Sequence, residues 1–324
     1  MAEGFGVLRD AVEQVLANPK ITFPDSVRVT KLYPAPLPDL FKGEQLVLAG
    51  RYSGQGDGAI QIEGSVNGET KKFAYDAKFA GEANDHEFIP RLWATRRVGY
   101  LLDEIRLRGE SKELKDEVSE LARKYNIVTP YTAYLIMEDE GRRGVAQNVR
   151  TFQMENPEAR RGLAANYDSF TKQKGGELAV GGARSSYSLK VADAPADAIL
   201  LGRVEVLKSE AKSMPMTVPP PGISPSRARP SVVSGPGASE LAKTRSDEYA
   251  QQSKFVKGRT FFQNGAQWVD TEVQKLSGTK PVRVQFASAE YFDLLKRHPE
   301  AQEWLATGRN LQLVLRGIVY EIHE

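Results

Sequence analysis

The chain has 324 residues, 44 Lys/Arg, 42 Asp/Glu and a formal net charge of +2. This length suits two ordinary domains with a linker, or one large domain. The absence of cysteine excludes disulfides, thiolate zinc sites, iron–sulfur clusters and a cysteine nucleophile. Only His86, His298 and His323 are available for a histidine metal site or a catalytic triad.

Charge is unevenly distributed along the chain. Residues 141–260 hold 19 Lys/Arg and 11 Asp/Glu, a balance of +8, which leaves −6 for the rest. Because the overall excess is far below that of a dedicated nucleic-acid binder, we expect no nucleic-acid partner. No apolar run reaches the ~18 residues of a membrane span, and the N-terminus lacks the layout of a signal peptide.

Hydrophobic spacing predicts the elements of the N-terminal part. Apolar residues at helical spacing predict a short helix within residues 1–20, stopped by Asn18-Pro19. From residue 21 to 79 apolar and polar residues alternate, which is typical of a half-buried antiparallel sheet. Asn67-Gly68 predicts a two-residue hairpin turn, because both positions require positive φ. Residues 54–58 predict a looser turn.

A helical hairpin is expected next. The period becomes helical from Phe88 to Gly109, and Ser111 is a candidate N-cap for a second helix that ends at Asn126 in the left-handed conformation. Residues 128–137, with Pro130 near the start, predict an extended segment. The first module, residues 21–140, would close there.

The remaining sequence predicts a linker in the middle of the chain and a folded C-terminal domain. Residues 141–254 are weakly helical and then rich in Pro, Gly and Ser, which is typical of a semi-extended linker from Pro215 to Pro236. Residues 255–324 predict a small α+β domain with hairpins at Asn264-Gly265 and Arg316-Gly317. The predicted fold class is therefore α+β.

Common catalytic motifs are absent from the sequence. It has no P-loop ending, no paired-histidine zinc helix and no Gly-x-Ser-x-Gly elbow, and the glycines at 54, 56 and 58 lack the spacing of a dinucleotide loop. His86, between Asp85 and Glu87, is a candidate acid/base group, although a capping or exposed histidine is the more common case.

Two charged segments have both a functional and a structural interpretation. Residues 138–140, Glu-Asp-Glu, could attract a divalent cation, but Arg142 and Arg143 follow at once and are expected to neutralise them. The arginines of residues 91–108 could contact phosphate, and pairing with Asp103, Glu104 and the acidic second helix is the simpler expectation.

Three segments carry a family resemblance. They are LPDLFKGEQL at 37–46, RLWA at 91–94 followed by LDEIR at 102–106, and YNIVTPYT at 125–132. In wording and order they resemble bacterial proteins with vault/inter-alpha-trypsin (VIT) and von Willebrand factor A domains, which are similar to inter-alpha-trypsin inhibitor heavy chains. The resemblance covers residues 21–138, residues 258–321 resemble the C-terminal region of longer members, and 141–254 resemble only their variable spacer.

The resemblance implies a supporting role. The family's metal-binding Asp-x-Ser-x-Ser motif is absent, so no catalytic, cofactor-binding or metal-binding residue is assigned and no cofactor is expected. Residues 1–20 would be a remnant of an upstream domain, and residues 21–79 a β-sandwich that supports it. The resemblance also implies the cell envelope or exterior as the compartment, and a protein partner, with a von Willebrand A domain as the candidate.

The leading interpretation is a non-catalytic interaction or scaffold protein, and not an enzyme. Two alternatives stay open: a hydrolase with an acid/base site near His86, and a protein that binds anionic polymers or lipid through its basic linker. Neither the oligomeric state nor the identity of the partner follows from the sequence.

Overall fold

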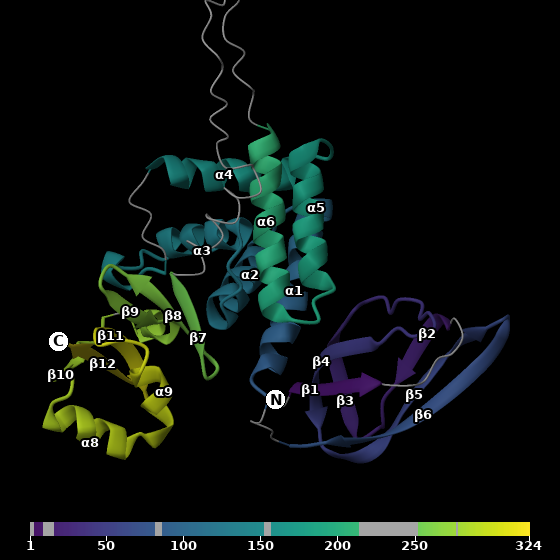
Figure 1. Ribbon diagram of the computed structural model, residues 1–324, viewed down its shortest axis with the longest axis horizontal. Coiled ribbons are helices and arrows are strands. Elements are labelled where there is room, and N and C mark those ends of the chain that lie inside the picture. Colours follow the sequence, from purple (N-terminus) through teal and green to yellow (C-terminus); the bar gives the residue numbers. More distant parts are fainter. Residues whose placement is uncertain (1–2, 9–15, 82–85, 152–156, 214–251, 277) are drawn as a thin grey trace, which may run out of the picture. The chain divides into compact units, whose positions relative to one another are not determined.

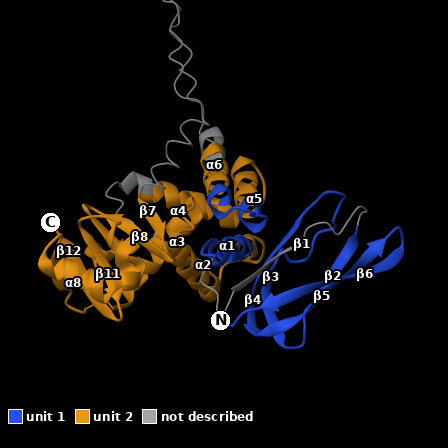
Figure 2. Cartoon of the chain, turned by 60° about the horizontal axis from the view of Figure 1, so that its bottom comes forward, with its two compact units in different colours: residues 1–102, 187–198 blue, residues 103–186, 199–324 orange. Residues whose placement is uncertain are grey.

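A computed structural model describes residues 3–8, 16–81, 86–151, 157–213, 252–276 and 278–324. Its elements confirm the α+β class (Figure 1). The chain divides into two compact units (Figure 2): unit 1 comprises residues 1–102 and 187–198, and unit 2 comprises residues 103–186 and 199–324. The predicted linker from Pro215 to Pro236 lies outside the described residues.

Two three-stranded antiparallel sheets form most of unit 1. One has the order β1 (Glu3–Leu8), β4 (Leu46–Gly54), β3 (Val27–Tyr33), and the other β2 (Ala17–Thr22), β5 (Gly56–Val66), β6 (Glu69–Phe79). Leu46 and Leu48 from the first sheet share a buried cluster with Ile62 and Val66 from the second. Inward-facing residues of both sheets thus form one core, as in a β-sandwich.

Of the two turns predicted in the sandwich, one is confirmed and the other is tighter than predicted. Asn67 and Gly68 have φ of 52° and 84° and join β5 to β6, which confirms the predicted hairpin. The predicted loose turn over 54–58 is tighter than expected. Only Gln55 separates β4 from β5, with Gly54 at φ 98° and Gly56 at 132°, and it carries the chain from one sheet to the other.

The predicted helix within residues 1–20 is wrong where the structure describes it. Residues 3–8 form strand β1, which pairs with β4 from Glu3↔Arg51 to Leu8↔Leu46, and Asn18 lies within β2 next to a register shift. Gly4 and Gly6 lower the helical propensity of a short segment, and the edge of β4 offers it backbone partners. Residues 9–15 of the predicted helix lie outside the described residues.

Helix α1 (Phe88–Arg108) confirms the first predicted helix, and Gly109 follows it with φ 98°. In unit 1 its residues Leu92, Ala94 and Val98 are fully buried. Trp93 is 2% exposed, and its indole N–H donates to the carbonyl of Lys31 in β3 at 3.0 Å. Helix α1 is therefore tied to the sandwich by packing and by a hydrogen bond.

Helix α2 (Lys112–Tyr125) confirms both predicted caps. The Ser111 side chain accepts from the Leu114 amide, and Asn126 adopts the left-handed conformation with φ 54°. Within unit 2, α2 packs on helix α3.

Helix α3 (Pro130–Arg142) replaces the extended segment predicted for 128–137. Thr129 and Thr132 form a capping box, and Pro130 stands at the start of the helix. Proline is well tolerated at the first helical position, because its missing N–H would be unbonded there anyway. The extended segment predicted for residues 128–137 is therefore wrong, and Pro130 begins a helix instead.

Residues 157–213 are more ordered than predicted. They form α4 (Pro157–Lys172), α5 (Glu177–Lys190) and α6 (Pro195–Ser213). Tyr167 and Phe170 of α4 are buried, and Phe170 stacks on Tyr131 of α3 with ring centroids 4.2 Å apart. A sparse apolar face suffices here, because neighbouring helices supply the aromatic partners.

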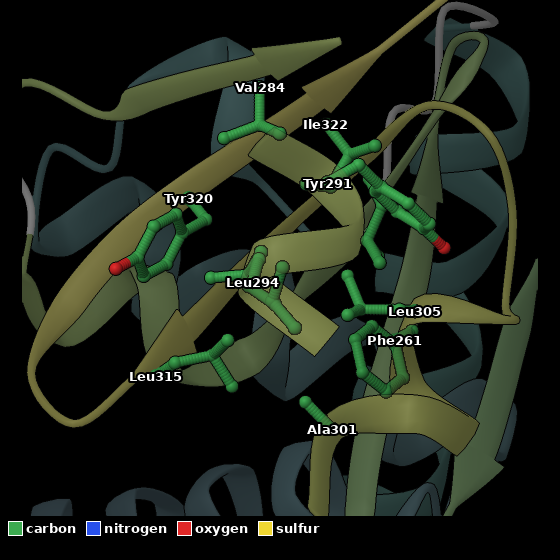
Figure 3. Close-up of a cluster of buried hydrophobic side chains, with 11 residues drawn as sticks. Phe261, Val284, Tyr291, Leu294, Ala301, Leu305, Leu315, Tyr320 and Ile322 are labelled. Atoms are coloured by element: carbon green, nitrogen blue, oxygen red, sulfur yellow. The ribbon is translucent and has the colours of Figure 1, made fainter. Parts of the chain in front are cut away.

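The C-terminal part of unit 2 is a mixed six-stranded sheet. Its order is β10 (Val282–Gln285), β12 (Ile318–His323), β11 (Leu311–Leu315), β9 (Gln267–Asp270), β8 (Arg259–Asn264), β7 (Ser253–Val256). Helices α8 (Ala289–Arg297) and α9 (Gln302–Leu305) cover one face, where Leu294, Leu305 and Leu315 are buried in the cluster of Figure 3. The predicted C-terminal α+β fold is confirmed.

Tight turns close the hairpins of this sheet. Arg316 and Gly317, with φ of 48° and 81°, form the predicted turn between β11 and β12. The β8–β9 hairpin is also confirmed, but its turn is one residue later than predicted, at Gly265-Ala266, and only Gly265 of the pair has positive φ. Short 3₁₀ turns, η1 (Gln147–Val149) and η2 (Thr271–Leu276), lie against the second face of the sheet.

Candidate functional site

His86 does not lie in a polar cluster. It is an exposed residue just before α1, with its ring 6.0 Å from that of Phe88, and Asp85 lies outside the described residues. His298 is buried beside Glu300, at 3.2 Å, and His323 is near the C-terminus. Among the described residues, the structure therefore does not place the three histidines near one another or near a nucleophile.

The acidic run 138–140 lies on α3, and each residue has different partners. Glu138 accepts from Lys115 at 2.8 Å, and Asp139 accepts from Arg142 and Arg143 at 2.9 Å each. The predicted neutralisation by the two arginines is confirmed for Asp139. Among the described residues no group of three His, Asp or Glu side chains is arranged to hold a metal ion.

Glu140 is the buried centre of a polar network that local sequence patterns do not predict. It is 1% exposed, and it accepts from the backbone amide and the hydroxyl of Thr151. Gln274 of η2 donates to the same carboxylate at 2.6 Å and also donates to the Val149 carbonyl at 2.9 Å. The amide oxygen of Gln274 accepts from Arg143 at 2.9 Å. The network joins α3 to the C-terminal sheet within unit 2.

A cavity of about 250 Å³ lies beside this network. Its lining combines acidic and basic side chains from α2, α3 and η2: Asp116, Glu120, Arg123, Lys124, Asp139, Arg143, Glu272 and Lys275. Arg123 donates to Asp139 at 2.7 Å, and Lys275 donates to Glu272 at 2.8 Å. Because these charges compensate one another across the lining, the arrangement suits a structural junction better than a site for a charged substrate.

The charges at this junction make stability depend on pH. Burial acts to raise the pKa of Asp139, but hydrogen bonds from Arg123 and Arg142 outweigh it and lower the pKa. A carboxylate with a lowered pKa in the folded state stabilises it above the unfolded value, about 3.9, and this contribution is lost as the pH falls through the folded pKa. We therefore expect unit 2 to lose stability progressively below about pH 4.

The measurement is chemical unfolding as a function of pH, with Asp139→Asn as the comparison. The variant should be less stable than wild type at pH 7 and should lose less stability between about pH 4 and pH 2, because it has no carboxylate to protonate at this position. If the stability of the two proteins changed with pH in the same way, Asp139 would not be responsible for the loss of stability at low pH.

Two arginines of α1 pair with acidic residues of the same helix, as predicted. Arg106 pairs with Asp103 and Arg108 with Glu104, both at 3.2 Å. Such pairs on one helix face contribute only about 0.3–0.5 kcal/mol each. The predicted structural role is thus confirmed for these residues.

Arg96 has a role that the charge pattern did not predict. It is 2% exposed in unit 1 and donates to the carbonyls of Ala192 (2.8 Å), Tyr33 (3.1 Å) and Val47 (2.6 Å). Burial lowers its pKa, although Asp193, at 3.1 Å, opposes this. Its place within the apolar stripe of α1 was the signal in the sequence that it would be buried.

Strand β6 is the longest of the edge strands of the two sheets and is a candidate docking surface. Strand β6 spans eleven residues and, among the described strands, pairs only with β5. Phe73, Tyr75, Ala77 and Phe79 alternate along it and are only half-buried, while residues 74, 76 and 78 between them are exposed. An edge with unpaired backbone groups and incompletely covered aromatic side chains can accept a further strand.

Comparison with known proteins supports part of the sequence-based resemblance. No protein family model and no solved structure matches the chain. Inter-alpha-trypsin inhibitor heavy chain 4 of mouse is 30% identical over 113 residues, which is 31% of this chain and 12% of the mouse protein. Heavy chains H4 of cattle and pig match over the same lengths at 30% and 28% identity. The chain therefore contains a region similar to these heavy chains and spans about an eighth of their length.

The described part of the chain contains no helix that is long and apolar enough to span a membrane. The VIT domain, the von Willebrand A domain and the bacterial origin implied by the resemblance stay predictions.

Proposed function

We propose that this protein is a non-catalytic interaction protein and that unit 1 docks onto another folded domain, with a von Willebrand A domain as the partner. The similarity to inter-alpha-trypsin inhibitor heavy chains over 31% of the chain supports an interaction role. The compensated charges around the 250 Å³ cavity and the exposed position of His86 give no support to a hydrolase.

The edge strand β6 is the observation that carries this proposal. A partner strand beside β6 would bond its free backbone groups and cover the half-buried rings of Phe73 and Tyr75. Burial of apolar area contributes about 25 cal/mol per Å², so these rings would add affinity to the backbone hydrogen bonds.

Charged side chains make β6 a poor partner for itself. Lys71, Lys72 and Lys78 are exposed along the strand. Lysines at a sheet edge oppose pairing between identical copies, because like charges would be brought together. The same edge stays open to a different chain that carries complementary charges.

The test is binding of the full chain to a purified von Willebrand A domain of an inter-alpha-trypsin inhibitor heavy chain, measured by calorimetry. Hydrogen exchange would then locate the contact. We expect saturable binding and slower exchange of β6 amides in the complex. Strand β3, the edge of the other sheet, is the matched internal control and should exchange at an unchanged rate.

Two results would count against the proposal. Absence of binding would exclude this partner, and binding with equal protection of β3 and β6 would show that the β6 edge is not the docking surface. Hydrolysis that is lost on replacing His86 by alanine would instead favour the enzymatic alternative.

A further inference from the structure

The two faces of strand β11 differ in composition. Leu311, Leu313 and Leu315 point into the core shared with α8 and α9. The alternating positions, Gln312 and Val314, lie on the opposite face, where Val314 packs against a cluster of valines. A glutamine thus occupies the second position of a central strand, on the face that carries these valines, and Glu321 of β12 lies opposite it.

Gln312 is buried without a polar partner. It is 7% exposed, and within the described part of the chain its side-chain amide makes no hydrogen bond. Gln274, equally buried at 6%, provides the contrast, because its amide donates to Glu140 and Val149 and accepts from Arg143. The Gln312 amide atoms are not among the fully buried, unbonded side-chain atoms of the described residues, so the amide is open to water or to a molecule in the space beside it.

A cavity of about 190 Å³ lies against Gln312. Its walls come from η1, η2 and strand β12, and they include Val149, Val273, Leu276 and Val319. Asn148 and Thr279, both exposed, stand at its rim. None of the described lining residues is charged. The cavity therefore has apolar walls, one buried amide and a polar rim.

We propose that this cavity is a binding site for a small neutral molecule with a benzene-sized apolar body and one hydroxyl or amide group that bonds Gln312. An apolar cavity of about 150 Å³ in another protein holds benzene, so the volume is sufficient for a ring. A neutral ligand suits the site better than a charged one, because none of the described lining residues carries a charge that could pair with it. The site lies in unit 2 and is independent of the β6 edge in unit 1.

Phenol and benzene are the probes, and the protein is the full chain. Saturation-transfer NMR and a titration would give both affinities. We expect phenol to bind about tenfold more tightly than benzene, since it adds one hydrogen bond to an amide that no described group of the protein bonds. Equal affinities, or no binding of phenol, would overturn the proposal.

Two variants test separately what the Gln312 amide and what the cavity contribute to binding. Gln312→Leu keeps the side-chain volume and removes the amide, so phenol should lose its tenfold advantage while benzene binds at least as well. Its melting temperature should be equal to or higher than that of wild type, because the amide has no partner to lose; a lower melting temperature would show a satisfied amide. Ala146→Phe, at an exposed lining position, should block both probes, and unchanged binding there would place them elsewhere.

Discussion

Replacement of Trp93 by alanine is expected to lower the free energy of unfolding of unit 1 by about 3–5 kcal/mol. The ring is 2% exposed, so the change leaves a large cavity where α1 meets β3. It also leaves the Lys31 carbonyl without its indole donor, and removes the ring over which the Arg51 guanidinium lies, 5.0 Å from the centroid.

Hydrogen exchange during denaturant unfolding would measure this effect, because it reports on unit 1 separately from unit 2. Trp93→Phe is the matched control. It keeps an aromatic ring and loses the bond to Lys31, so the cost should be about 1–2 kcal/mol. Unchanged stability of the alanine variant would mean that the ring does not lie in the core.

Replacement of Glu140 by alanine is expected to destabilise unit 2 by about 3–5 kcal/mol. The carboxylate accepts from two donors of Thr151 and from Gln274, and all three groups are buried. Removing the acceptor takes this partner from the Thr151 amide and hydroxyl, while Gln274 keeps its bonds to Val149 and Thr151. A buried donor that loses its partner costs more than the net value of the bond.

Glu138→Ala, two residues earlier on the same helix, is the control. Glu138 is about 40% exposed and pairs with Lys115, so its loss should cost less than about 1 kcal/mol. Trp268 and Trp304 both lie in unit 2 and provide a fluorescence signal for its unfolding. If the two alanine variants had equal stability, Glu140 would not anchor the sheet to α3.

Local signals in the sequence were sufficient for the elements that depend on backbone geometry. Asn67-Gly68 and Arg316-Gly317 turn where positive φ is needed, and Ser111 and Asn126 cap α2 as predicted. Each of these depends on residues within a few positions of one another, so tertiary context has little opportunity to override them.

Strand β1 and helix α4 depend on distant partners, whereas α3 was misassigned although its capping box is a local signal. Strand β1 exists through pairing with β4, some forty residues away in the register Glu3↔Arg51 to Leu8↔Leu46. Helix α4 is packed through Tyr167 and Phe170 against rings of α3, which had itself been predicted as extended. Because residues 128–137 were predicted as extended, the helix whose rings pack against α4 was absent from the prediction.

The candidate sites likewise combine features that local sequence predicts with features that depend on distant residues. The sequence by itself determined the α+β class, the capped helices, the tight hairpins and the neutralisation of Asp139 by Arg142 and Arg143, because these are interactions between near neighbours. Only the tertiary structure decided that Glu140 meets Gln274 across 134 positions and that Gln312 faces a cavity without a partner. Burial and hydrogen bonding between segments far apart in sequence depend on how the chain folds back on itself, which no local pattern encodes.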